Sequence, residues 1–338
     1  MSLIYNIKFT KSSFINIFND YYSEVKHFAR RIRNPLLKIL MIILKSIEWG
    51  IYHWYKSSIR RFYGVRGNEL IFNITKRCNE KCAKCGIWKN PEKDDERLSI
   101  DVFIQCLNAL KKNLYQVTIT GGEPLLFKDE ILKIAKEARE NNIPVVTVTN
   151  GVLSDEIFVQ KYGEMKHILV FSIDTLNKEK WKILRGTASY NIVMNNLNIA
   201  KKILGKRLQI QTVLAKENKD DINEIVTYCK KNNLKHTIQP YMDFGGHLHP
   251  VEKSSNNTSN MPCAARKNIV ILQNGDVIKC FDHYRIPYAK LPLGNIKHED
   301  IITILCKRRS IEVSRIMKYC NLPCKNLSCN IPATEFYD

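Results

Sequence analysis

Six short segments rich in β-branched residues recur between residues 70 and 240, with helix-like stretches between them. The strand-like segments cover residues 70–75, 115–120, 144–149, 168–174, 207–214 and 234–240. The helix-like stretches cover residues 100–112, 129–141, 190–204 and 221–232. This alternation predicts an α/β fold with a parallel sheet and right-handed crossovers. Because six units rather than eight can be counted, we expect a partial (β/α)6 TIM-like barrel, with its functional groups at the C-terminal ends of the strands.

Three cysteines, Cys78, Cys82 and Cys85, follow the first predicted strand. Thiolates this close in sequence can converge on one soft metal centre, either zinc or iron–sulfur. A closed structural zinc site requires four ligands, and no fourth Cys or His lies nearby in the sequence. Three ligands to a four-iron cluster would leave one iron open to a small molecule. Structural zinc is the alternative.

A second motif, Gly121-Gly122-Glu123-Pro124, follows the second predicted strand. Two adjacent glycines allow backbone N–H groups to approach a ligand closely. The carboxylate of Glu123 can accept a hydrogen bond from an ammonium group. Because it comes after the cysteine loop, at the same end of the predicted sheet, the motif indicates a binding site rather than a simple turn.

The two motifs in this order resemble those of the radical S-adenosylmethionine (radical SAM) superfamily, over roughly residues 67–240. The resemblance implies a [4Fe–4S] cluster on Cys78, Cys82 and Cys85, whose open iron binds the amino and carboxylate groups of S-adenosylmethionine. One-electron reduction, by a donor such as ferredoxin or flavodoxin, would yield a 5′-deoxyadenosyl radical that takes a hydrogen atom from the substrate. The protein would orient the cofactor and exclude water.

The resemblance also implies a set of cofactor-binding residues at the strand ends. These are Gly121, Gly122, Glu123, Pro124, Asn150, Ser172, Asp174, Arg185 and Gln211. Ser172 and Asp174 match positions that reach the ribose hydroxyls, and Arg185 matches an arginine that meets the cofactor carboxylate. A simple turn at Asn150 and a polar barrel-interior role for Gln211 are the alternatives. The chain departs from the family at Lys84, where an aromatic or apolar residue is usual.

A second cysteine set begins with Cys263, which precedes a predicted hairpin, and Cys280, which ends it. The hairpin is predicted from the dipeptide Asn274-Gly275 between two apolar runs. An LGNI segment at residues 293–296 and a predicted helix over residues 301–317 follow. The chain then supplies Cys320, Cys324 and Cys329.

Residues 260–330 resemble the SPASM or twitch extension of radical SAM enzymes. The resemblance implies one auxiliary [4Fe–4S] cluster, bound by Cys263, Cys280 and two of the last three cysteines. A zinc site made of the same thiolates is the alternative. We therefore expect a barrel domain at residues 67–245 and a cysteine-rich, hairpin-plus-helix extension at residues 246–338.

Residues 1–66 are predicted to form a separate basic helical segment, because they contain twelve Lys and Arg against three acidic residues. Its apolar stretch 36–54 contains Lys38, Lys45 and Glu48, which would be costly in a membrane span. A helix here would have one basic and one apolar face, as do helices that lie on an anionic membrane surface. We expect a cytoplasmic protein, associated peripherally with the inner face of the membrane. A helix packed on the catalytic domain is the alternative.

The net charge of +20 fits an anionic partner or simply a Lys-rich composition. Eight of the eleven cysteines fall in the two sets, and such clustering favours metal ligands in a reducing compartment over a disulfide framework. A basic, zinc-stabilised protein that binds nucleic acid or membrane without catalysis is the competing class. That class does not explain the Gly-Gly-Glu-Pro motif, Asp174 and Arg185 at successive strand ends. We therefore expect an enzyme, and no nucleic-acid partner.

The sequence constrains the substrate less than the chemistry. The basic segment favours a lipid- or glycan-linked substrate, and a peptide remains open. Molybdopterin-precursor synthases share the layout but end in Gly-Gly, whereas this chain ends at Asp338. Tyr241, Asp243, His247 and His249 follow the sixth predicted strand, where a substrate could lie, and a polar connecting loop is the alternative. An electron passed to an auxiliary cluster would make the reaction a net oxidation.

Overall fold

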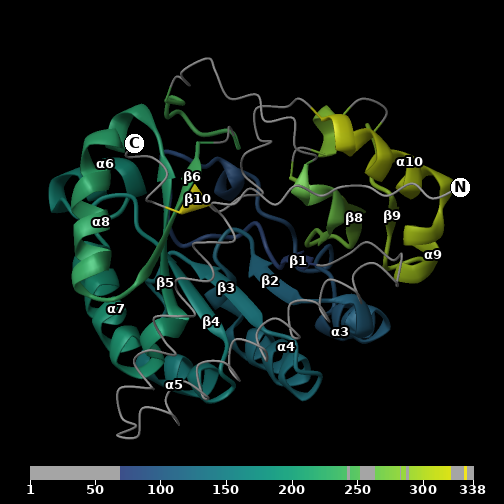
Figure 1. The fold of residues 1–338 in the computed structure, drawn as a ribbon, viewed down its shortest axis with the longest axis horizontal. Coiled ribbons are helices and arrows are strands. Elements are labelled where there is room, and N and C mark those ends of the chain that lie inside the picture. Colours follow the sequence, from purple (N-terminus) through teal and green to yellow (C-terminus); the bar gives the residue numbers. More distant parts are fainter. Residues whose placement is uncertain are drawn as a thin grey trace, which may run out of the picture. The chain divides into compact units, whose positions relative to one another are not determined.

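One sheet of ten strands organises the part of the chain that the computed structural model describes (Figure 1). The described residues are 69–241, 244–251, 263–281, 283–286, 289–320 and 331–332. The strand order is β10-β6-β5-β4-β3-β2-β1-β7-β8-β9. The predicted basic segment at residues 1–66, including the apolar stretch 36–54, lies outside the described residues.

The six strands β1 to β6 are parallel and neighbour one another in chain order. They are β1 (Glu69–Asn73), β2 (Gln116–Thr120), β3 (Val145–Thr149), β4 (Ile168–Ser172), β5 (Leu208–Leu214) and β6 (Lys235–Pro240). Each begins and ends within two residues of its predicted bounds. Burial alternates along β2 and β3, as expected where one face of each strand meets covering helices and the other faces a lumen. The predicted partial barrel is confirmed.

Six helices follow the outer side of these strands (Figure 1). They are α3 (Ile100–Leu110), α4 (Lys128–Glu140), α5 (Glu156–Glu164), α6 (Lys178–Arg185), α7 (Tyr190–Leu204) and α8 (Ile222–Lys231). α4 shows why they pack there, because its buried residues Ile131, Ile134, Ala135 and Ala138 recur at helical spacing. The sequence analysis missed α5 and α6. Their capping residues Asp155 and Asn177 accept backbone N–H bonds and were a usable signal.

The C-terminal extension continues the barrel sheet. β7 (Asn268–Ile271) and β8 (Asp276–Ile278) form the predicted antiparallel hairpin, with Gly275 at φ +91° in its turn. β7 also pairs in parallel with β1, which the sequence analysis did not predict. β9 (Gly294–Asn295), from the LGNI segment, pairs with β8, and β10 (Ile331–Pro332) pairs with β6.

The helix predicted over residues 301–317 is two helices, α9 (Ile301–Cys306) and α10 (Arg308–Ile316). The prediction of one helix is wrong because Lys307 is extended, with φ −58° and ψ 141°, and this breaks the helical hydrogen-bond series. Both helices still bury apolar residues, among them Ile304 and Val313. Within the described ranges, no helix combines the length and apolar character needed to span a bilayer.

Candidate functional site

The loop after β1 brings Cys78, Cys82 and Cys85 to one cavity of about 510 Å³. The cavity occupies the lumen of the barrel, because inward residues from the start to the end of the strands line it, from Glu69 to Asn73 in β1. The cysteines lie at the C-terminal ends of the strands, where the barrel rule predicts function. Among the described residues, no three His, Cys, Asp or Glu side chains are grouped so as to hold a single metal ion.

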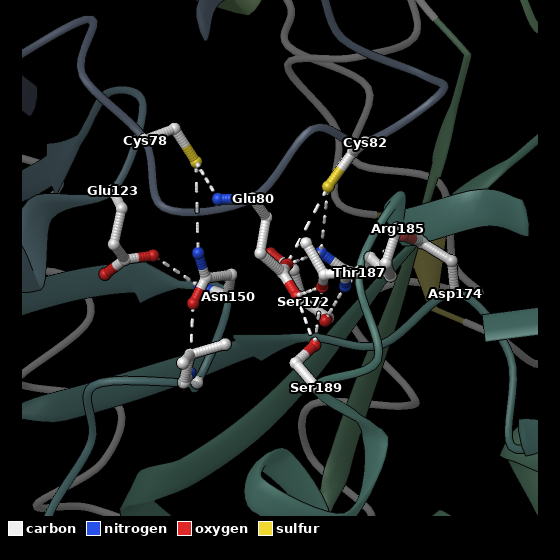
Figure 2. A network of polar contacts seen from close by, with 12 residues as sticks. Cys78, Glu80, Cys82, Glu123, Asn150, Ser172, Asp174, Arg185, Thr187 and Ser189 are labelled. Carbon is white, nitrogen blue, oxygen red and sulfur yellow. Dashed lines mark hydrogen bonds and ion pairs between the residues drawn. The ribbon is translucent and has the colours of Figure 1, made fainter. Parts of the chain in front are cut away.

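Two thiols of this loop, Cys78 and Cys82, have polar neighbours and are largely buried. The backbone N–H of Glu80 lies 3.4 Å from Cys78 Sγ, and the side-chain amide of Asn150 lies 3.9 Å from it (Figure 2). Burial raises the pKa of Cys78 to about 12. Burial also raises the pKa of Cys82, although Arg185 and Lys84 oppose the shift. Burial thus favours the protonated form of both thiols, and binding of a metal would require loss of these protons.

A chain of four buried or half-buried charged side chains crosses the site, and Figure 2 labels three of them, Glu80, Arg185 and Asp174. Arg185 Nη1 lies 3.5 Å from Glu80 Oε2, and Arg185 Nη2 lies 3.3 Å from Asp174 Oδ2. Lys84 Nζ lies 2.7 Å from the same oxygen of Asp174. Thr187 and Ser189 donate hydrogen bonds to Glu80. Both Glu80 and Lys84 belong to the cysteine loop, so the network ties the loop to α6 and the end of β4.

Arg185 and Asp174 hold their charges despite burial. Burial raises the pKa of Asp174, but Lys84 and Arg185 outweigh it and lower the value to about 2. Burial lowers the pKa of Arg185, and Asp174, Cys82 and Glu80 raise it by more. Arg185 lines the cavity and has a buried Nε with no hydrogen-bond partner. An unpartnered guanidinium N–H beside a cavity fits an anionic ligand group.

The two glycines of the Gly-Gly-Glu-Pro motif line the cavity, whereas Glu123 and Pro124 are buried behind it. A Cβ on Gly121 would lie 2.4 Å from the Thr75 carbonyl oxygen, so this close approach requires glycine. The Glu123 carboxylate accepts bonds from Thr149 Oγ1 at 2.7 Å and from the backbone N–H of Asn150 at 2.8 Å. The motif's carboxylate thus joins the ends of β2 and β3.

Three further predicted residues line the cavity: Asn150, Ser172 and Gln211. Asn150 donates to Asn79 Oδ1 at 2.7 Å, within the cysteine loop. The Ser172 carbonyl accepts a bond from Arg185. Gln211 donates to Gln239 Oε1 at 2.9 Å inside the barrel. Asp174, by contrast, is 3% exposed and does not line the cavity.

The second cysteine set faces the same cavity. Cys263, Cys280 and Cys320 all line it, together with the three cysteines of the first loop. Asn268 pairs with Glu69 at the start of β1, and β8 runs antiparallel to β7, so Cys263 and Cys280 lie at the N-terminal end of the barrel strands, opposite the first cysteine loop. Cys324 and Cys329 lie outside the described residues.

Residues 244–247 hold the cysteine loop from the other side, which the sequence analysis missed. The N–H of Gly86 donates to the Phe244 carbonyl at 2.9 Å, and the N–H of His247 donates to the Ala83 carbonyl at 2.9 Å. A Cβ on Gly246 would lie 2.4 Å from the carbonyl carbon of Lys84. The pair Gly245-Gly246 was the sequence signal for this contact.

Of the polar residues expected near the substrate, the described ones, Tyr241, His247 and His249, do not line the cavity. His249 is on the surface, where its Nδ1 lies 2.6 Å from Glu217 Oε1. Tyr241 and His247 are absent from the lining, and Asp243 lies outside the described residues. The alternative of a polar connecting loop accounts for Tyr241, His247 and His249.

Comparison with known proteins agrees with this geometry. The sequence profile of the radical SAM superfamily matches residues 72–229, and that of the SPASM iron–sulfur cluster-binding domain matches residues 263–330. The chain carries a radical SAM domain followed by a SPASM domain. A radical SAM enzyme of this kind has a [4Fe–4S] cluster that binds S-adenosylmethionine, and auxiliary iron–sulfur clusters. The non-catalytic zinc-stabilised alternative therefore does not hold.

Relatives named GTP 3′,8-cyclase are similar in sequence to this radical SAM enzyme. A GTP 3′,8-cyclase of Peptoclostridium acidaminophilum is 26% identical over 71% of this chain and 76% of its own. A GTP 3′,8-cyclase of Clostridium botulinum is 28% identical over 50% of this chain and only 54% of its own length.

Solved structures share the fold at lower identity. Streptococcus suis SuiB bound to S-adenosylmethionine has a TM-score of 0.64 at 16% identity, covering 93% of this chain and 83% of its own. The enzyme anSMEcpe with bound AdoMet and a peptide has a TM-score of 0.54 at 20% identity, covering 76% and 85%. These likenesses support the architecture of the radical SAM barrel with its extension.

Proposed function

We propose that this radical SAM enzyme removes a hydrogen atom from a neutral, polar substrate held between its two cysteine sets. One observation carries the proposal: a single cavity is lined by Cys78, Cys82, Cys85, Cys263, Cys280 and Cys320. A substrate in that cavity is within reach of both sets at once. A substrate that fills the barrel lumen would limit the access of water to a reactive radical.

The cofactor assignments follow from the donor chemistry. Cys78, Cys82 and Cys85 would hold the cluster that binds S-adenosylmethionine, with Gly121 and Gly122 giving close backbone approach beside it. When bound and reduced by a small donor such as ferredoxin or flavodoxin, the cluster and S-adenosylmethionine would together supply a 5′-deoxyadenosyl radical. Arg185, with its unpartnered Nε, would hold the cofactor carboxylate.

The auxiliary set would consist of Cys263 and Cys280 with two of Cys320, Cys324 and Cys329. When bound, such a cluster would accept one electron from the substrate radical. With the loss of a proton, this completes a two-electron oxidation that begins with removal of the hydrogen atom. This is the oxidoreductase chemistry that we propose.

The lining of the cavity favours a neutral substrate. Within the described residues, its amide side chains are Asn73, Gln116, Asn150, Gln209, Gln211, Gln239 and Asn268. Its basic side chains there are Lys84, Arg185 and Lys235, and the first two already contact Asp174. Amides donate and accept hydrogen bonds, as peptide groups and sugar hydroxyls require.

A GTP-cyclising reaction is the second candidate, because curated relatives of that name are 26% to 28% identical. A triphosphate requires several unpaired cations at its site. Lys235, at the start of β6, is the described basic lining residue that does not contact Asp174.

Deuterium transfer distinguishes the candidates. Reconstituted enzyme would be reduced with S-adenosylmethionine and one of three probes: uniformly deuterated peptides, uniformly deuterated oligosaccharides, or GTP deuterated in its ribose. Mass spectrometry of the 5′-deoxyadenosine reports where the hydrogen atom came from. Deuterium from peptides or oligosaccharides supports the proposal, whereas deuterium from GTP alone contradicts it in favour of the cyclase reaction.

We further propose that the basic segment 1–66 attaches the enzyme peripherally to the cytoplasmic face of a membrane. The segment contains twelve basic and three acidic residues, which supports binding to an anionic surface. A lipid- or glycan-linked substrate would then reach the enzyme at the membrane surface. Full-length protein should bind vesicles containing anionic lipid in a salt-sensitive way. A variant without residues 1–60 that binds the same vesicles equally well would contradict the proposal.

A further inference from the structure

Lys84 is the residue at which the chain departs from the pattern of its family, and it lies in the cofactor cavity. It lines the cavity beside Cys85, and its side chain is 16% exposed. Its ammonium contacts Asp174 Oδ2 at 2.7 Å. An ammonium has three N–H donors and no acceptor, so donors remain for a ligand after one is given to Asp174.

The Asp174 carboxylate is engaged on both oxygens. Oδ1 accepts a bond from the backbone N–H of Val213 at 3.0 Å, while Oδ2 contacts Lys84 and Arg185. Asp174 does not line the cavity, whereas Lys84 does. The expectation that Asp174 reaches the ribose directly therefore lacks support from the geometry.

The backbone around Lys84 is held on both sides. The residue before it, Ala83, accepts a bond from the N–H of His247, and its own N–H donates to the Leu184 carbonyl. Gly246 packs so closely on Lys84 that a Cβ there would lie 2.4 Å from its carbonyl carbon. A backbone fixed this way aims the side chain with little freedom, which is the requirement for a binding residue.

We propose that Lys84 donates a hydrogen bond to the nucleoside part of S-adenosylmethionine, and that Asp174 is the positioning residue that holds Lys84. Asp174 offsets the charge of the ammonium, so Lys84 presents N–H donors rather than an unpaired charge. Such a group suits the neutral acceptors of a nucleoside, its hydroxyl oxygens and ring nitrogens, better than a carboxylate. This inference rests on the proposed cofactor site.

The test compares two ligands by calorimetry on anaerobically reconstituted full-length protein. S-Adenosylmethionine carries both nucleoside and carboxylate, whereas 5′-methylthioadenosine carries the nucleoside alone. Lys84→Met should lower the affinity for both ligands by a similar factor, about tenfold or more. Lys81→Met, the same change in the same loop at an exposed residue that does not line the cavity, should bind both like wild type.

The double variant tests the role of Asp174. Asp174→Asn should lower the affinity for 5′-methylthioadenosine in the wild-type background. In the Lys84→Met background it should cause no further loss of affinity, because Asp174 acts through Lys84. Iron content and the melting temperature of each variant show that it is folded. If Asp174→Asn does not fold, the two lysine variants decide alone.

Three outcomes would overturn the inference: unchanged binding in Lys84→Met, weakening of S-adenosylmethionine only, or a further loss when Asp174→Asn is added to Lys84→Met. Wild-type protein with a full iron content that binds neither ligand would overturn the proposed cofactor site itself, which separates the two failures.

Discussion

Glu123 shows what a single buried carboxylate does at this site. It is fully buried, and its oxygens accept bonds from Thr149, from the N–H of Asn150 and from the N–H of Leu125 at 2.9 Å. From its residue type we expected an acceptor for an ammonium group, yet its bonds join two strand ends. The sequence reveals the residue type, but the partners depend on the register of β2 against β3.

The pH dependence of stability should carry the signature of Glu123. Burial raises its pKa to about 7, well above its usual 4.5. The folded state therefore binds an extra proton between these values, so this carboxyl makes the free energy of unfolding fall as pH rises from about 4.5 to 7. Glu123→Gln should flatten that slope, by up to about 3 kcal/mol across the window. Equal slopes in chemical denaturation of both proteins between pH 5 and 7 would refute this role.

At the scale of elements, short connecting segments fix the site while strands and helices support it. The strands were predictable because runs of β-branched residues mark them locally, as in residues 145–149. α5 and α6 were missed because nine and eight residues carry little periodicity. The contact of residues 244–247 with the cysteine loop joins segments about 160 residues apart, and no local pattern encodes such a contact.

Gly246 should be needed for this contact. Gly246→Ala puts a Cβ against the backbone of Lys84, so we expect the loop to shift, iron content after reconstitution to fall by half or more, and the melting temperature to drop. Gly205→Ala is the control, because nothing lies within 4 Å of its Cβ. Its backbone, at φ 55° and ψ −125°, strains any residue with a Cβ, so this control should lower the melting temperature while leaving the iron content unchanged. Iron content that stays the same in Gly246→Ala would be evidence against a loop held by close glycine packing.

At the scale of the whole molecule, the extension and the barrel share a sheet and a cavity. β7 pairs with β1 over four residues, and Ile269 and Ile271 belong to the main apolar core. The parallel pairing was not predictable, because β1 and β7 are separated by almost 200 residues. Cysteine spacing, in contrast, predicted both cysteine sets but not that they line one cavity.

Ile271 tests whether barrel and extension unfold together. Ile271→Ala removes a fully buried side chain and should cost about 2–5 kcal/mol. Circular dichroism and iron–sulfur absorbance should then lose signal in one shared, earlier transition. Ile311→Ala, at a residue that is 52% exposed, should stay within about 0.5 kcal/mol of wild type. Two separate transitions would indicate that the extension unfolds independently of the barrel.

The most direct test of the central claim counts iron and sulfide per chain and measures 5′-deoxyadenosine release from S-adenosylmethionine under reduction. Wild type would be compared with the triple alanine variant of Cys78, Cys82 and Cys85. We predict about eight irons in wild type and about four in the variant, with nucleoside release abolished. Unchanged iron content, or nucleoside release that persists in the triple variant, would contradict the account of the site.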